Sequence, residues 1–165
     1  MRVLARSYFA LLLYVSTAAA QTAGLTDNDL LAAYCLGVHQ SRVVALPQLA
    51  LLYCGTEEAA TKCRQDLAPW LAATLEEADG IRKRFARYII ARGFTTNPEL
   101  QEHLPRIAAA TKIGQKDYEN CRTTLRQDPC MEKCRDTTGQ CFNQCRTQLP
   151  TCVRVDRCGR QDIVP

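Results

Sequence analysis

The stretch from Cys121 to Cys158 reads CRTTLRQDPCMEKCRDTTGQCFNQCRTQLPTCVRVDRC and holds seven of the ten cysteines of this 165-residue chain. Five of them follow one another at steps of 4, 7, 4 and 7 residues: Cys130, Cys134, Cys141, Cys145 and Cys152. Because residues four apart share one face of a helix, this spacing indicates cysteine pairs on short helices.

Two Cys-x3-Cys motifs, Cys130 to Cys134 and Cys141 to Cys145, favour two helices rather than one. A continuous helix would separate Cys134 from Cys141 by about 10.5 Å, too far for a disulfide. Gly139 is expected to end the first helix. Folding back about the turn places Cys134 opposite Cys141 and Cys130 opposite Cys145, so these two bonds are predicted.

This twin motif resembles that of the small coiled-coil-helix proteins and of the small inner-membrane chaperones of mitochondria, which staple a helical hairpin in the same way. The resemblance covers residues 130–145, and the six residues between the motifs are fewer than in those families. It implies a stapled hairpin, and no function is carried over from it.

Residues 1–20 match the three regions of a secretory signal peptide, with Arg2 and Arg6, an apolar run from Tyr8 to Val15, and small residues up to Ala20. Cleavage is expected after Ala20. The apolar run is less than half of the roughly 20 residues that a membrane anchor needs. The mature protein is therefore expected to be secreted or periplasmic, without a transmembrane segment.

Loss of two arginines with the signal lowers the formal net charge from +4 to +2, too little to indicate a nucleic-acid partner. Ten cysteines in an exported chain predict a framework of five disulfides. The expected organisation is a helical bundle over residues 21–120 and a cysteine-rich helical hairpin over 121–165, packed on the bundle as one folded domain.

Residue spacing does not settle the disulfide partners of the six cysteines outside the hairpin. Cys121 is expected to bond to the N-terminal helices, with Cys63 as the favoured partner. Cys35 is expected to face Cys54 across a turn near Ala45, and a bond from Cys35 to Cys63 is the open alternative. The six cysteines outside the hairpin bonds are Cys35, Cys54, Cys63, Cys121, Cys152 and Cys158.

Capping residues at 26–29 and 56–58 and prolines at 47 and 69 predict separate helices over 27–42, 47–53, 56–69 and 69–92, the last ended by Gly93. Apolar residues then recur at alternating steps of 4 and 3 from Leu100 to Leu125, in a helix kinked at Pro105. This helix and the one over 69–92 are expected to pack as an antiparallel pair. Strand signals are nearly absent, so the predicted fold is an all-α, disulfide-stapled helical bundle.

Catalytic chemistry is not indicated. Cys35 and His39 lie four apart and offer a thiolate with its base, but an exported chain favours Cys35 in a disulfide and His39 at the margin of the core. The only tryptophan, Trp70, is also expected in the core. The protein is therefore predicted not to be an enzyme and to use no cofactor.

Two functions remain open. The favoured one is an exported, non-enzymatic interaction or scaffold protein. The alternative is a metal-thiolate protein binding Cu(I) or Zn, because helical Cys-x3-Cys pairs resemble the cysteine-lined bundles of bacterial copper-storage proteins. An oxidising destination favours disulfides over metal.

A basic row on the predicted helix over 69–92 suggests a contact surface. No acid occurs from Gly80 through Pro98, whereas five cations do: Arg82, Lys83, Arg84, Arg87 and Arg92. These residues are either a solvated face, partly offset by Asp79, or a contact for an acidic protein or an anionic envelope component.

Overall fold

The computed structural model describes residues 24–54, 60–133 and 139–159, and within these ranges it leaves out the side chains of 49–54, 60, 131–132 and 139–143. The described residues are all-α and contain no strand, as predicted. The helices are α1 (Asp27–Cys54), α2 (Ala60–Ala91), α3 (Pro98–Gln101), α4 (Leu104–Gln127), α5 (Pro129–Lys133), α6 (Gly139–Gln148) and α7 (Pro150–Arg157).

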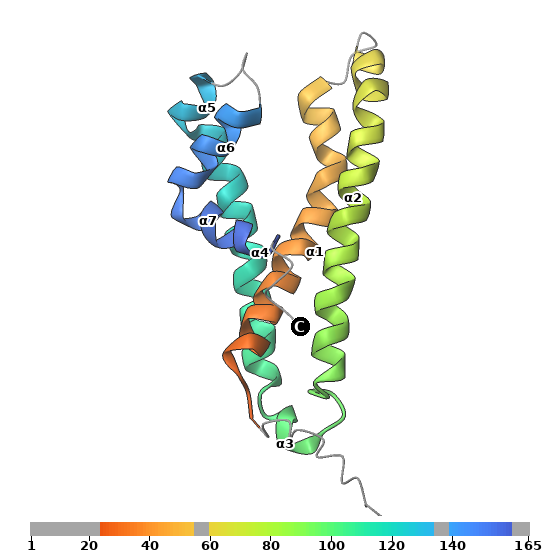
Figure 1. Cartoon of the computed structure of the whole chain (residues 1–165), viewed down its shortest axis with the longest axis vertical. Helices are drawn as coiled ribbons and strands as arrows, with labels where there is room; N and C mark the ends of the chain where they lie inside the picture. Colours follow the sequence, from red (N-terminus) through yellow and green to blue (C-terminus); the bar gives the residue numbers. More distant parts are fainter. Residues whose placement is uncertain (1–23, 55–59, 134–138, 160–165) are drawn as a thin grey trace, which may run out of the picture.

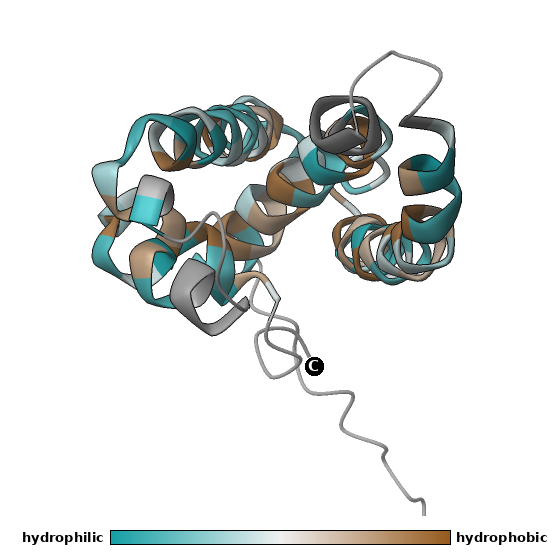
Figure 2. Cartoon of the chain, turned by 90° about the horizontal axis from the view of Figure 1, so that it is seen from above, coloured by the Kyte–Doolittle hydropathy of each residue, from teal (hydrophilic) through white to brown (hydrophobic). Residues whose placement is uncertain are grey.

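Helix α1 lies at the centre, with α2 on one flank and α4 on the other, and α5 to α7 lie along α4 (Figure 1). The predicted antiparallel pairing of the segments now seen as α2 and α4 is wrong, because each packs chiefly on α1. Buried residues on more than one side of α1, among them Ala32, Ala33 and Val38, explain this: α1 covers the apolar stripes of both neighbours. Figure 2 shows hydrophobic residues along this central helix.

Two predicted helix breaks are wrong. Pro47 lies inside α1 and Pro69 lies inside α2. An internal proline removes one backbone hydrogen bond, whereas ending a helix leaves up to four amides or four carbonyls unpaired at that end. Ala45 and Leu46, each 3% exposed, further anchor the turn before Pro47 in the core.

The turn after α2 follows the prediction at Gly93, whose φ of 77° is a left-handed value that favours glycine. Its amide donates to the Ile90 carbonyl over 2.9 Å, closing the last turn of α2. The predicted single helix kinked at Pro105 is instead two helices, α3 and α4. Pro105 lies in the first turn of α4, where its missing amide costs no intrahelical hydrogen bond.

The predicted seam is confirmed, although it is divided between α3 and α4. Its residues are buried or partly buried along the whole length: Leu100, Leu104, Ile107, Thr111, Gly114, Tyr118, Cys121 and Leu125. At its middle, α4 crosses α1 at two buried glycines, Gly37 and Gly114. A Cβ at Gly37 would overlap the Thr111 carbonyl oxygen, and one at Gly114 would overlap the Tyr34 carbonyl oxygen. The two backbones therefore touch directly.

Three described disulfides hold the C-terminal helices in place. Cys130 and Cys145 are bonded between α5 and α6, as the spacing predicted. The predicted partner bond, Cys134 to Cys141, lies outside the described side chains. Gly139 begins α6 rather than ending the preceding helix.

The other two disulfides overturn the predicted long-range pairs. Cys121 bonds to Cys152, so a bond from Cys121 to Cys63 is wrong, and Cys35 bonds to Cys158. A bond from Cys35 to Cys54 is excluded because both belong to the continuous helix α1, where 19 residues rise about 28 Å. Cys63, on α2, is disulfide-bonded as well, but neither to Cys35 nor to Cys121.

The C-terminal helix shares the main core. Cys152, Val155 and Cys158 belong to the same buried cluster as residues of α1, α2 and α4, namely Ala32, Cys35, Val38, Phe85, Cys121 and Leu125. At the α1 and α4 surface, Asp117 accepts hydrogen bonds from Tyr34 and Arg154, both over 3.1 Å. These contacts hold both α1 and α7 against α4, and a cavity lies beside that junction.

Candidate functional site

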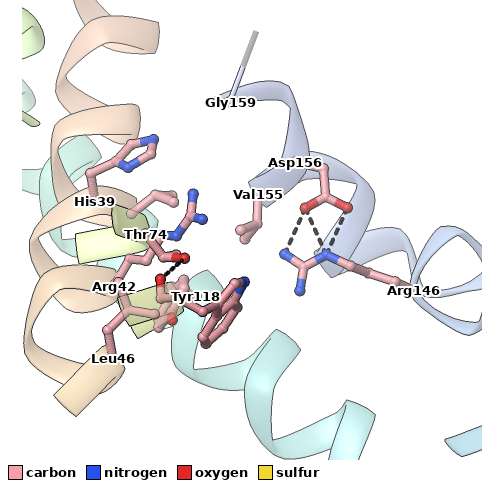
Figure 3. Close-up of a pocket in the computed structure, with 11 residues that line it drawn as sticks. His39, Arg42, Leu46, Thr74, Tyr118, Arg146, Val155, Asp156 and Gly159 are labelled. Carbon is pink, nitrogen blue, oxygen red and sulfur yellow. Dashed lines mark hydrogen bonds and ion pairs between the residues drawn. The ribbon is translucent and has the colours of Figure 1, made fainter. Parts of the chain in front are cut away.

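A cavity of about 330 Å³ lies where α1, α2, α4, α6 and α7 meet (Figure 3). Arg146 and Asp156 lie on the side of the cavity opposite His39 and Arg42. The lining combines aliphatic, aromatic and charged side chains from distant parts of the chain: Val38, His39, Arg42, Leu46, Trp70, Thr74, Tyr118, Arg146, Val155, Asp156 and Gly159. Concave sites of this size and mixed lining are typical of small-ligand binding.

His39 contributes a buried hydrogen-bond acceptor to the lining of the cavity. It is 1% exposed, and its Nε2 lies 3.1 Å from the Cys158 carbonyl oxygen. A carbonyl only accepts, so Nε2 carries the hydrogen and donates it. Burial, with smaller contributions from the nearby Arg42 and Arg84, lowers the His39 pKa to about 4 against the opposing hydrogen bond to Cys158, so the ring is neutral near pH 7. Nδ1 is then a lone-pair acceptor, buried and without a hydrogen-bond partner among the described residues.

The His39 contact depends on the disulfide framework. Cys35 lies one helical turn before His39 on α1, and its bond to Cys158 carries the Cys158 carbonyl to the imidazole. His39 is thus a fully buried residue rather than one at the margin of the core. Cys35 is oxidised, so the pair does not provide a thiolate and its base.

The charges of the lining leave one cation unbalanced. Arg146 binds Asp156 through both Nε and Nη2, with a shortest distance of 2.6 Å, so these two charges offset each other. Arg42 is partly buried, and no carboxylate among the described residues lies within ion-pair distance of it. With His39 neutral, Arg42 gives the cavity a net positive charge.

Two aromatic residues form the remaining wall. Trp70 is 54% exposed, so its predicted place in the core is wrong. The Thr74 hydroxyl donates to the Trp70 carbonyl, one turn earlier on α2, over 2.8 Å. Tyr118 is half-buried, and burial raises its pKa, so its hydroxyl stays protonated. The cavity therefore offers flat apolar surface next to its polar groups.

The predicted basic row lies on α2, and its five residues differ in whether they are paired with a carboxylate. Arg92 is only 12% exposed and pairs with Asp29 at 2.7 Å, so it is not available to a partner. Arg82 and Lys83 both bind Asp79, at 2.6 and 2.7 Å. Arg84 and Arg87 have no ion pair with any described carboxylate, and contact of Lys83, Arg84 and Arg87 with an acidic protein or an anionic envelope component stays a prediction.

Arg92 belongs to an internal network that joins the start of α1 to the end of α2. Asp29 is fully buried and accepts hydrogen bonds from Arg92, from Tyr88 and from Thr26, which caps α1. Burial alone would raise the Asp29 pKa, but the hydrogen bonds from Arg92, Thr26 and Tyr88 outweigh it and lower the pKa to about 2. This carboxylate is structural and is ionised at every pH above about 4.

The cysteines whose side chains the structure describes form disulfides. Disulfides contain Cys35, Cys63, Cys121, Cys130, Cys145, Cys152 and Cys158. In the same ranges, no group of three or more His, Cys, Asp or Glu residues is placed to hold a metal ion. Disulfides of this kind are typical of oxidising, extracytoplasmic environments. None of the described helices has the length and apolar character to cross a membrane.

Comparisons with known proteins add no relative. The chain matches no protein-family model, and neither a curated protein nor a solved structure is detectably similar to it.

Most of the cavity is not visible in the sequence as a pattern. Arg42 and Tyr118 are ordinary members of helical faces, and Arg146 and Asp156 lie in the cysteine-rich stretch without any motif linking them to α1. The one available signal was Trp70, an isolated tryptophan next to a proline. The structure places Trp70 in the lining of the cavity, 54% exposed.

Proposed function

We propose that this protein is an exported, non-enzymatic binding module that takes a small ligand in the cavity between α1, α2, α4, α6 and α7. The observation that carries the proposal is that two residues of α1 line one cavity: buried His39, whose Nδ1 has no partner among the described residues, and partly buried Arg42, which has no ion pair with a described carboxylate. A buried acceptor without a partner and an unbalanced cation in one concave site are groups that a ligand can complement.

Export is supported by the disulfides and by the predicted signal peptide over residues 1–20. If the full-length chain is expressed in a bacterium with an oxidising periplasm, the purified protein should begin at Gln21. Its intact mass should be lower than that of the reduced chain by about 10 hydrogens. Retention of residues 1–20, or free thiols in the native protein, would contradict this part of the proposal.

Binding is testable because Trp70 is the only tryptophan and lines the cavity. Its single indole N–H resonance should shift in a saturable way with a subset of compounds in a fragment library. Thr74→Phe should block these shifts by filling the cavity. Ala73→Phe, which adds the same side chain at an exposed neighbouring position of α2 outside the lining, should leave them intact.

If no fragment produces a response that Thr74→Phe abolishes, the binding proposal is wrong. The metal-thiolate alternative is less favoured, since the cysteines with described side chains are in disulfides and a disulfide sulfur lacks the negative charge that binds soft metals.

A further inference from the structure

We infer that the ligand is a small organic monoanion: a carboxylate on a flat, apolar body that also carries a hydroxyl or N–H donor. This inference rests on the proposed function and specifies what the cavity takes. It follows from three features of the lining, each of which demands a different part of the ligand.

The negative group is assigned by Arg42. Arg146 and Asp156 make three contacts of 2.6 to 2.9 Å, so their opposite charges offset each other. Arg42, partly buried and without a described carboxylate partner, is the unbalanced cation of the lining. A carboxylate matches its planar fork of donors and makes charge-assisted hydrogen bonds.

The donor group is assigned by His39. Its Nε2 hydrogen is donated to the Cys158 carbonyl, so Nδ1 has only a lone pair. Nδ1 is buried, so a ligand donor reaches it only when a neighbouring side chain of the lining shifts. A second anion cannot satisfy a lone pair, whereas a hydroxyl or N–H can. His39 and Arg42 lie three residues apart on α1 and share one face, so the two polar groups of the ligand must be about 5 to 6 Å apart.

The flat body is assigned by Trp70 and Tyr118, with Val38, Leu46 and Val155 completing an apolar surface. Aromatic side chains bind planar groups by offset or edge-to-face contact. A cavity of about 330 Å³ lies at the small end of ligand sites, so one ring suits it better than a long chain or a polymer.

Three probes of nearly equal size separate these requirements: 4-hydroxybenzoate, its uncharged isostere 4-hydroxybenzamide, and benzoate, which lacks the donor. Titrations followed at the Trp70 indole N–H and by calorimetry should rank 4-hydroxybenzoate first. Loss of the charge should weaken binding about tenfold or more, and loss of the hydroxyl about fivefold. Inorganic phosphate, which carries charge without an apolar body, should not shift Trp70.

Arg42→Gln should abolish the preference for the carboxylate over the amide. Arg87→Gln, which removes an equal charge at an exposed position of α2 outside the cavity, should preserve it. Equal binding of acid and amide by the unaltered protein, or an unchanged preference in Arg42→Gln, overturns the inference.

The two proposals fail differently. If neutral fragments shift Trp70, Thr74→Phe blocks them, and 4-hydroxybenzoate has no advantage, the binding module stands and the anion assignment is wrong. If no compound gives a response that Thr74→Phe abolishes, both are wrong.

Discussion

Gly37 and Gly114 set the distance between α1 and α4, because each lies against the backbone of the other helix with no room for a side chain. This single contact fixes where the two helices cross. It therefore fixes which residues of α1 face the C-terminal helices, His39 and Arg42 among them.

Gly37→Ala or Gly114→Ala should each destabilise the protein by about 3 kcal/mol, because the added methyl meets backbone that cannot rotate away. Gly80→Ala is the matched control: Gly80 is in α2 with nothing within 4 Å of an added Cβ. That change should stabilise the helix by about 0.5 to 1 kcal/mol. Urea denaturation measures all three, and equal effects at positions 37 and 80 would contradict the close crossing.

His39 makes stability depend on pH. Its pKa is about 4 in the folded protein and 6.5 in the unfolded chain. Between these values the unfolded chain binds more protons, so this contribution is complete above pH 6.5 and is lost as pH falls toward 4, by about 3 kcal/mol. Asp29, with its pKa lowered from 3.8 to about 2, adds a second loss between pH 4 and 2.

His39→Gln should remove the first loss and keep the second, because glutamine does not titrate but still donates a hydrogen bond. His103→Gln, at the only other histidine, should leave both. Denaturation midpoints measured at pH 7, 5.5, 4.5 and 2.5 distinguish the variants. A full loss between pH 6.5 and 4 in His39→Gln would assign it to another group.

At the scale of elements, the N-terminus of α1 and the C-terminus of α2 are joined by the buried pair of Asp29 and Arg92. Arg92 also donates to the Gly24 carbonyl over 2.9 Å, so the chain before α1 is held by the same guanidinium. In the sequence, Arg92 looks like the last residue of a basic surface. In the structure it joins α1 to α2 instead, because the buried carboxylate of Asp29, 63 residues earlier, pairs with it.

Asp29→Asn should cost about 3 kcal/mol, because it leaves the largely buried Arg92 without a counter-charge. Asp27→Asn is the control, since Asp27 is exposed in the same first turn of α1 and its loss should cost under about 0.5 kcal/mol. Thermal and urea denaturation at pH 7 provide the comparison. Similar losses in the two variants would show that the buried pair contributes little.

At the scale of the whole molecule, disulfides determine which ends meet. The bond from Cys35 to Cys158 spans 123 residues and closes α7 onto α1, whereas the bond from Cys130 to Cys145 spans 15 within the hairpin. Only the first carries the Cys158 carbonyl and Gly159 to the cavity.

The double variant Cys35→Ala with Cys158→Ala should therefore lose about 5 kcal/mol, against about 3 kcal/mol for Cys130→Ala with Cys145→Ala, because the longer loop gains more entropy on unfolding. The first variant should also lose the ligand response at Trp70, and the second should keep it. Equal ligand responses in the two variants would mean that the cavity forms without the long-range bond.

The sequence alone determined the helical class, the buried seam from Leu100 to Leu125, the stop at Gly93 and the bond from Cys130 to Cys145. Each depends on residues within a few turns of one another, where periodicity and spacing act directly. Tertiary structure decided the partners of Cys35 and Cys121, the pairing of Arg92 and the cavity. These depend on where α1 and α4 cross, and that crossing is fixed by two glycines 77 residues apart, whose effect is steric and leaves no periodic pattern in the sequence.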